Sequence, residues 1–235
     1  IITPRFVPSC TSELMTGLAK LAKEYDVPVQ SHLSENHGEI DWVASLHPES
    51  SNYTDVYYEH HLMGTVPTVM AHCIHLSDVE MDRMAETQTM VSHCPYSNVN
   101  LSSGIAPIRK LIERNIPIGL GSDISGGHIV SMAKVLTEAI GLSKMKWAEV
   151  DPNYAPLTLS EAFYMATKGG GQFFGHVGSF EKGYELDALI IDDTSLFDLN
   201  ERSLEERLER WLYVGDDRHI IERYVAGRVV PSPKG

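Results

Sequence analysis

The sequence predicts an α/β fold: a parallel sheet of the (β/α)8-barrel type, followed by a small β module. Short apolar segments alternate with stretches of helical periodicity. This alternation indicates a parallel sheet, because neighbouring parallel strands must be joined by a crossover, which is usually a helix. Four of these segments end in a histidine or an aspartate, and a barrel builds its site from several strand tips. An open sheet would bind at one switch point beside a glycine-rich phosphate turn. The segment "GLGSDISGG" lacks that dinucleotide spacing, so we favour the barrel.

The predicted elements follow in order along the barrel segment. The first helix has an apolar stripe at i, i+4, i+7, i+8 and i+11, formed by Leu14, Leu18, Leu21, Ala22 and Tyr25. The predicted strands are the nearly continuous apolar runs at 27–34, 68–74, 89–95 and 116–123. Two helix starts have the capping-box spacing of a hydroxyl residue and a glutamate, namely Ser77 with Glu80 and Thr158 with Glu161.

The pattern changes after about residue 175. Short strands with glycine turns replace the alternation of strands and helices, in "GHVGSFEKGYELDALIIDD" and "RYVAGRVV". Ser203 with Glu206 marks the start of an intervening helix. We therefore expect residues 1–175 to belong to the barrel and residues 176–235 to form a small β module beside it.

Composition and charge exclude several classes of function. The 235 residues are 43% apolar and 22% charged, with a formal net charge of −13. This charge argues against a nucleic-acid duplex as a partner, because the phosphate backbone needs a lysine- and arginine-rich surface. A single base or nucleoside stays open as a substrate. No apolar run reaches the ~18 residues that suggest a membrane-spanning helix, so no membrane partner is expected.

The cysteines indicate the redox compartment. Cys73 and Cys94 lie inside apolar, strand-like runs, and with Cys10 they make an odd number. Buried reduced thiols fit these positions better than disulfides do, which favours a cytoplasmic protein.

Ionisable residues at the strand tips are the main indication of function. His32, His72, His93 and Asp123 end the four predicted strands, and Glu35 follows the first. Taken singly, each has a structural explanation: a hydrogen-bonded core histidine, a carboxylate at a helix start, or a helix cap. Together they favour a shared task, because buried polar groups need partners. Imidazole and carboxylate suit zinc or ferrous iron, and a carboxylate such as Glu35 is suited to transfer protons.

Other catalytic motifs are absent from the sequence. His47-Pro48-Glu49 has the H-x-E pattern of the cytidine-deaminase family, but no P-C-x-x-C follows it. There is no G-x-S-x-G, P-loop or H-E-x-x-H, which argues against serine hydrolases, nucleotidases and zincins.

Several ordered motifs resemble the amidohydrolase superfamily. Strands five to eight of the superfamily's barrel are resembled, in order, by the segments "QSHLSEN", "VMAHC", "SHCPYSN" and "GLGSD". The small β-sandwich that accompanies the barrel is resembled by the segment "GSFEKGYELDALIID". Within the superfamily, the guanine deaminase family is similar in "TPRF", "LSSG" and "YVGDDRHIIERYVAGRVV". The resemblance implies the C-terminal part of a distorted, metal-dependent-hydrolase-type (β/α)8 TIM barrel with part of a small β-sandwich. The implied activity is zinc-dependent hydrolysis of guanine, a purine base, to xanthine and ammonia.

The resemblance implies roles for individual residues. His32 and Asp123 would bind the zinc, and Asp123 would also accept a proton from the attacking water. Glu35 would protonate the ring nitrogen beside the attacked carbon and then help ammonia leave. His72 would polarise or hydrogen-bond the attacking oxygen. The implied substrate contacts are made by His32, Glu35, Asp123, Arg5 and Phe6.

The residues outside the strand tips also fit this interpretation. The guanidinium group of Arg5 matches the O6 and N7 acceptor edge of guanine, and the ring of Phe6 can stack on a purine. Asn98 in "HCPYSN" is expected to organise the floor of the site.

One family motif is missing. The first strand of the family carries an H-x-H pair that completes the metal site, and no H-x-H occurs in this sequence. A closed barrel with a sandwich also needs more than the ~250 residues of a minimal barrel. We therefore expect an N-terminal part of the same protein to supply the missing ligands, and residues 1–235 alone to be inactive. The resemblance further suggests a homodimer.

Two alternatives stay open. Another aminohydrolase of the superfamily, acting on cytosine, adenosine derivatives or a triazine, would share the same strand-tip residues. A non-enzymatic scaffold with an amidohydrolase-like fold would not need His32, Glu35, His72 and Asp123, so their presence argues against it.

Overall fold

A four-stranded parallel sheet forms the centre of the larger part of the molecule. The computed structural model describes residues 1–196 and 199–231. The sheet has the order β1-β2-β3-β4, so neighbours in the sequence are neighbours in space. Its strands are β1 (Val29–Leu33), β2 (Thr68–His72), β3 (Met90–His93) and β4 (Ile118–Leu120). All four lie within the predicted runs, and the predicted α/β fold with a parallel sheet is confirmed.

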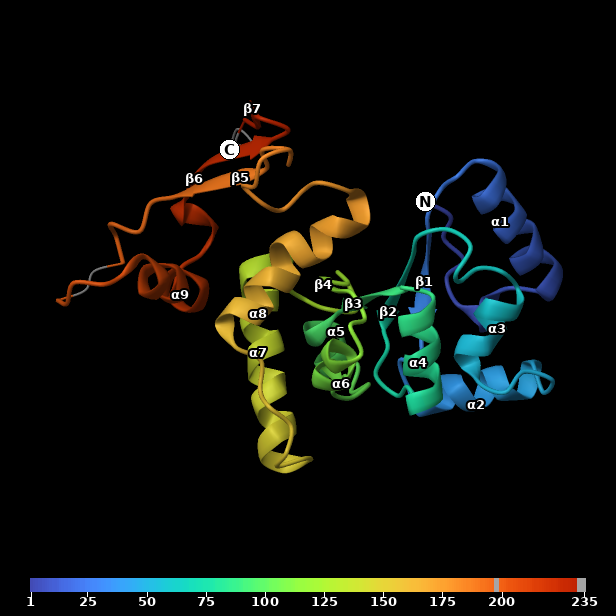
Figure 1. Ribbon diagram of the computed structural model, residues 1–235. Coiled ribbons are helices and arrows are strands. Elements are labelled where there is room, and N and C mark those ends of the chain that lie inside the picture. The colour runs from blue at the N-terminus through green and yellow to red at the C-terminus, as the bar shows by residue number, and fades with distance from the viewer. Residues whose placement is uncertain (197–198, 232–235) are drawn as a thin grey trace.

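Helices connect the strands and cover one side of the sheet (Figure 1). They are α1 (Ser12–Glu24), α2 (His37–Leu46), α3 (Tyr53–Glu59), α4 (Asp78–Glu86), α5 (Pro95–Asn100), α6 (Ile108–Glu113), α7 (Met132–Glu149) and α8 (Leu159–Tyr164). Short helical turns occur at Val7–Ser9, Met165–Gly169, Gln172–Phe174 and Asp217–His219. Within the described residues, no helix combines the length and apolarity needed to cross a membrane.

Local capping sets several of these helix starts. The predicted capping boxes of Ser77 with Glu80 and of Thr158 with Glu161 both form, with side chain and backbone bonded in each direction. A third box joins Asn36 and Glu39 at the start of α2, and the sequence analysis missed it. These bonds satisfy the amide groups that a helix start leaves without partners.

Helix α1 is confirmed, and the predicted apolar stripe coincides only in part with the side that it buries. Leu14, Leu21 and Tyr25 of the stripe are exposed, whereas Ala22 is buried and Leu18 packs against the core. Met15 and Ala19, which lie outside the stripe, are also buried. The periodicity therefore predicted the helix correctly and its buried side only in part.

The core lies between the sheet and its covering helices. Its fully buried side chains include Met15, Leu33, Tyr57, Met70, Met84 and Leu111. The hydroxyl group of Tyr57 donates a hydrogen bond of 2.8 Å to the backbone carbonyl oxygen of His32. This bond ties the end of β1 to helix α3. The core therefore fixes the strand end from which His32 projects.

The C-terminal residues form a separate small sheet, drawn in orange and red in Figure 1. Its antiparallel strands are β5 (Ala188–Ile191), β6 (Ile220–Val225) and β7 (Arg228–Val229), and helix α9 (Leu204–Val214) precedes β6. Helix α9 begins with the predicted Ser203–Glu206 capping box. It is held against α7 by Lys134, whose Nζ donates to two backbone carbonyls of α9. Positions 197–198 and 232–235 of the expected β module lie outside the described residues.

Candidate active site

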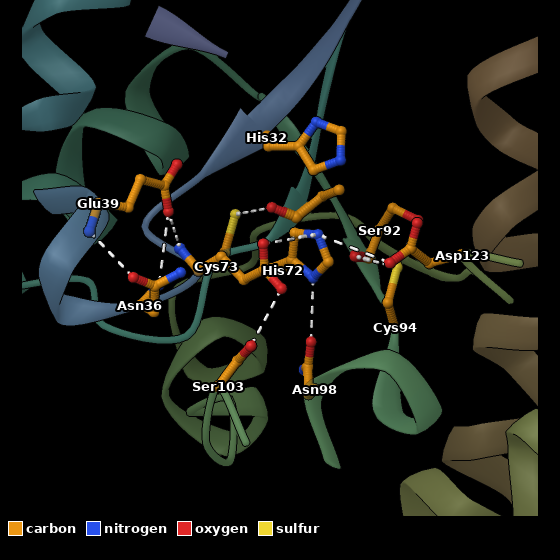
Figure 2. Close-up of polar contacts among 12 residues, drawn as sticks. His32, Asn36, Glu39, His72, Cys73, Ser92, Cys94, Asn98, Ser103 and Asp123 are labelled. Atoms are coloured by element: carbon orange, nitrogen blue, oxygen red, sulfur yellow. Dashed lines mark hydrogen bonds and ion pairs between the residues drawn. The ribbon is translucent and has the colours of Figure 1, made fainter. Parts of the chain in front are cut away.

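Four of the predicted site residues meet at one edge of the parallel sheet. His32 projects from β1, His72 ends β2, Glu35 follows β1, and Asp123 lies three residues after β4. The Nε2 atom of His72 is 3.8 Å from Oε2 of Glu35 and 4.0 Å from Oδ2 of Asp123. The rings of His32 and His72 stack with centroids 5.2 Å apart. Figure 2 shows both histidines and Asp123 on the same side of the strand ends.

The orientation of His32 is fixed by a backbone carbonyl. Its Nδ1 lies 2.7 Å from the carbonyl oxygen of Arg5, and its backbone N–H donates to the same oxygen at 3.2 Å. A carbonyl oxygen can only accept, so Nδ1 carries the proton and Nε2 keeps its lone pair. This is the arrangement in which a histidine binds a metal through one nitrogen and is oriented through the other.

His72 is held from the side opposite to the site. Its Nδ1 donates to Oδ1 of Asn98 at 3.0 Å, while its buried Nε2 has no hydrogen-bond partner within the described residues. The backbone of His72 has a φ of 71° and that of Cys73 a φ of 51°. Such left-handed conformations cost free energy in residues other than glycine, and they gather at functional sites. Asn98 therefore fixes the ring of His72 with Nε2 directed at the two carboxylates.

Glu35 is held by two residues that the sequence analysis did not predict. The hydroxyl group of Ser103 donates to Oε1 of Glu35 at 3.0 Å. The backbone N–H of Glu35 donates to the buried carboxylate of Glu39 at 2.8 Å, and Tyr53 donates to the other oxygen of Glu39 at 2.7 Å. The spacing of Asn36 and Glu39 is that of a capping box, and it could have predicted that the carboxylate of Glu39 lies at this helix start, next to the backbone of Glu35. Ser103 lies in the segment "LSSG" that resembles the guanine deaminase family, but it is 68 residues from Glu35, and no local spacing indicated this contact.

A glycine turn encloses the carboxylate of Asp123. A Cβ atom at Gly126 would lie 2.5 Å from Oδ2 of Asp123 and 2.7 Å from Oγ of Ser97. The backbone N–H of Gly127 donates to the carbonyl oxygen of Asp123 at 2.6 Å. The turn therefore closes around Asp123 only because residue 126 has no side chain.

His93, the remaining strand-tip histidine, is neutral and buried. Burial, with a smaller contribution from nearby His72, lowers the pKa of His93 to about 3. A neutral imidazole at the end of β3 adds no positive charge beside His72. His93 is 1% exposed, and its buried Nδ1 has no hydrogen-bond partner within the described residues.

Arg5 and Phe6 lie beside β1, at the edge where Ile2 pairs with Val29. The guanidinium group of Arg5 is 5.1 Å from the centroid of the Phe6 ring. Phe6 in turn packs edge-on against Trp42 of α2, with ring centroids 6.2 Å apart. The structure thus brings the backbone of Arg5 against His32, and its side chain against Phe6.

A cavity of about 360 Å³ opens along the sheet face next to these groups. This volume is within the range of small-molecule sites. Its lining includes Gln30, His32, Ala71, Ser92, Cys94 and Asp123. Three consecutive residues of β1, namely Gln30, Ser31 and His32, contribute to this lining. His32 and Asp123 therefore connect the polar cluster to a space that can hold a ligand.

The residues present fit part of a metal site. Among residues 1–196 and 199–231, no three His, Cys, Asp or Glu side chains group closely enough to hold a metal ion by themselves. His32 nevertheless directs a lone-pair nitrogen away from its Arg5 contact, and Asp123 offers a carboxylate 30% exposed. Nitrogen and carboxylate oxygen are ligands that zinc accepts.

Comparison with known proteins places this site in a wider context. The amidohydrolase family model matches residues 1–230. Guanine deaminase from Dictyostelium discoideum is 44% identical over 98% of this chain and 52% of its own length. The crystal structure of guanine deaminase from C. acetobutylicum, with guanine bound in its active site, is 54% identical with a TM-score of 0.95, over 98% of this chain and 55% of its own. An adenosine deaminase structure from Xanthomonas campestris with bound zinc shares the fold at 22% identity and a TM-score of 0.84, over 97% of this chain and 50% of its own.

The chain spans about half the length of the relatives that it matches. The similarity therefore extends along nearly all of this chain but covers only one part of each relative.

Proposed function

The chain belongs to the amidohydrolase family, and from this we infer that it is the C-terminal part of a guanine deaminase, which hydrolyses guanine to xanthine and ammonia. The observation that carries the proposal is that Glu35 and Asp123 each lie within 4.0 Å of Nε2 of His72 at the sheet edge, beside the oriented ring of His32. The similarity to guanine deaminases over 98% of the chain supports the choice of substrate.

His32 and Asp123 would hold a zinc ion, and ferrous iron would fit the same donors. When bound, the metal supplies a water molecule that ionises near neutral pH. The remaining ligands would come from an N-terminal part of the same protein that carries the H-x-H pair.

The side chains of this chain would then move the protons. Asp123 accepts a proton from the attacking water. Glu35 delivers its proton to the ring nitrogen next to the attacked carbon. It then passes the proton that Asp123 accepted on to the departing amine, so that ammonia leaves, and the remaining proton of the attacking oxygen returns to Glu35 as the product carbonyl group forms. His72 hydrogen-bonds to the attacking oxygen through Nε2, which Asn98 keeps directed into the site. One water is consumed and one ammonia released in each cycle.

Arg5 and Phe6 would recognise the base. The guanidinium donors of Arg5 match the acceptor edge of guanine, and the ring of Phe6 offers a stacking surface. Both lie beside β1, and the guanidinium group of Arg5 is placed 5.1 Å from the centroid of the Phe6 ring.

The architecture and assembly are proposed on the same basis. Residues 1–175 would form the second half of the (β/α)8 barrel, and residues 176–235 part of a small β-sandwich. The TM-score of 0.95 to a related enzyme supports this assignment.

The free cysteines Cys10, Cys73 and Cys94 favour the cytoplasm. A homodimer is proposed from the family resemblance.

The substrate proposal is tested with the full-length protein that contains this chain. Wild type and Arg5→Ala are assayed on guanine, cytosine, adenosine and a triazine, with Lys23→Ala on the exposed part of α1 as a control for loss of a surface cation. We expect wild type to prefer guanine, and Arg5→Ala to raise the KM for guanine while the control stays unchanged. A wild-type preference for another base, or guanine turnover that survives in Arg5→Ala while another base is preferred, would contradict the assignment.

A further inference from the structure

The side chain of Ser103 lies outside the sheet but contacts the proton-transferring carboxylate. Ser103 is 6% exposed, in the loop that follows α5. Its hydroxyl group donates a 3.0 Å hydrogen bond to Oε1 of Glu35, and Figure 2 shows this hydroxyl directed into the cluster from below. Ser103 takes no part in the proton transfers proposed for the site.

The loop holds Ser103 through its backbone as well as by packing. The N–H of Ser103 donates to the carbonyl oxygen of Asn98 at 2.8 Å. The Nε2 of His75 lies 2.8 Å from the carbonyl oxygen of Ser103 and must therefore donate to it. At Gly104 the φ is 130°, and a Cβ atom there would lie 3.1 Å from Ile74 and 3.3 Å from the His75 ring. Glycine at this position therefore lets the loop close on His75, which fixes the Ser103 backbone.

The two oxygens of Glu35 consequently have different surroundings. Oε1 is engaged by the Ser103 hydroxyl, whereas Oε2 faces Nε2 of His72 at 3.8 Å. A carboxylate that can rotate freely would exchange these oxygens. The bond from Ser103 removes that freedom and leaves one oxygen directed at the reacting groups. Fixed orientation of a proton-transferring group is a large part of its catalytic effect.

We propose that Ser103 is a positioning residue for Glu35, which holds Oε1 so that Oε2 transfers the proton. The inference rests on the proposed function, because it assigns Glu35 the proton transfer. Ser103 also receives backbone contacts from Asn98 and His75 that do not involve its hydroxyl group. Removal of the hydroxyl group therefore leaves the backbone contacts of the loop in place. It removes only the hydrogen bond to Oε1 of Glu35.

The test compares Ser103→Ala, Ser103→Thr and the neighbouring, exposed Ser102→Ala in the full-length protein. Hydrogen bonds to charged groups correspond to about 10- to 100-fold in rate. We expect Ser103→Ala to lower kcat for guanine by that factor, with KM, zinc content and melting temperature close to those of wild type. Ser103→Thr keeps the hydroxyl and should recover most of kcat, and Ser102→Ala should match wild type.

A double variant separates positioning from a general structural role. In a Glu35→Gln background the carboxylate is gone, so Ser103→Ala should cost little further in kcat. Three results would each overturn the proposal. They are a wild-type kcat in Ser103→Ala, an effect of Ser103→Ala on KM alone, and a fall in kcat on adding Ser103→Ala to Glu35→Gln that equals its fall in the wild-type background. Should Ser103→Ala fail to fold, Ser103→Cys keeps the side-chain size with a weaker donor. A reduced kcat in that variant supports the proposal, and a wild-type kcat overturns it.

The wild-type assay keeps this test distinct from that of the proposed function. If wild type turns over a different base and not guanine, the substrate assignment fails. The same Ser103 variants are then compared on that base, because the inference concerns how Glu35 is held. Only the ratio of variant to wild-type kcat decides the role of Ser103.

Discussion

The carbonyl oxygen of Arg5 accepts a hydrogen bond from Nδ1 of His32 at 2.7 Å. This contact joins the segment proposed to recognise the base to the residue proposed to hold the metal. It also determines which nitrogen of His32 stays free. In the proposed site, substrate and metal binding would thus both depend on one backbone position beside β1.

His32→Ala is expected to reduce the zinc content of the full-length protein from about one ion per chain to a small fraction of that, because a ligand is lost. His60→Ala is the matched control: its Nδ1 also bonds a backbone carbonyl, that of Val56, at 2.8 Å, but it ends α3 away from the site. Metal analysis after dialysis gives the result. Equal zinc in both variants would remove His32 from the ligand set.

Glu35→Gln should lower kcat for guanine by about 10²- to 10⁴-fold, the usual contribution of a proton-transferring side chain. The amide keeps the size of the carboxylate, so zinc content should stay near that of wild type. Glu24→Gln, at an exposed position of α1, controls for the change in net charge. Steady-state rates of xanthine formation measure the effect, and a Glu35→Gln enzyme with a wild-type kcat would exclude the proposed role.

Gly126→Ala should weaken zinc binding by about 10- to 100-fold, in line with other residues that orient metal ligands. The added methyl group would meet Oδ2 of Asp123 at 2.5 Å and Oγ of Ser97 at 2.7 Å, so the carboxylate must move. Gly141→Ala is the control, because a Cβ atom there has no neighbour within 4 Å in helix α7. It should bind zinc normally and stabilise the helix slightly. Unchanged zinc affinity in Gly126→Ala would show that the turn does not hold Asp123.

The pair of Arg109 and Glu161 should make stability depend on acid pH. Arg109 contacts both carboxylate oxygens of Glu161, at 2.7 and 3.0 Å, and these bonds lower the pKa of Glu161 from 4.5 to about 2. Because the folded-state pKa is the lower one, the pair stabilises the fold fully above about pH 4.5 and loses its effect as the pH falls towards 2.

Glu161→Gln should therefore melt earlier than wild type at pH 7, by the equivalent of about 1 kcal/mol for a partly solvated pair. The difference in melting temperature should shrink between about pH 4.5 and 2. Thermal melts of both proteins at a series of pH values check this. A difference that stays constant across that window would mean that the charge of Glu161 contributes nothing.

The parts of the fold that depend on local sequence were predictable. The boxes at Ser77 and Thr158 join residues three positions apart, and each formed. The strand runs were confirmed because apolar β-branched segments and their flanking helices are also local features. The meeting of His32, His72 and Asp123 followed from one further rule, that parallel strands end at the same edge of a sheet.

Contacts set by loop packing could not be read in this way. The bond from Ser103 to Glu35 spans 68 positions, and the space around Gly126 depends on how one turn lies against α5. Helix α1 illustrates the limit of periodicity. Leu14 and Leu21 of the predicted stripe are exposed, whereas the core buries Ala22 of the stripe together with Met15 and Ala19 outside it. The direction in which Arg5 extends its side chain depends equally on neighbours that the sequence does not specify.

The most direct test of the account measures zinc content and guanine turnover for the full-length protein and for residues 1–235 alone. In the proposed function, residues 1–235 hold only part of the metal site. We therefore expect about one zinc per full-length chain, xanthine formation by that protein, and no turnover by residues 1–235 alone. Turnover by residues 1–235 alone, or a zinc-loaded full-length protein that leaves guanine unchanged, would contradict it.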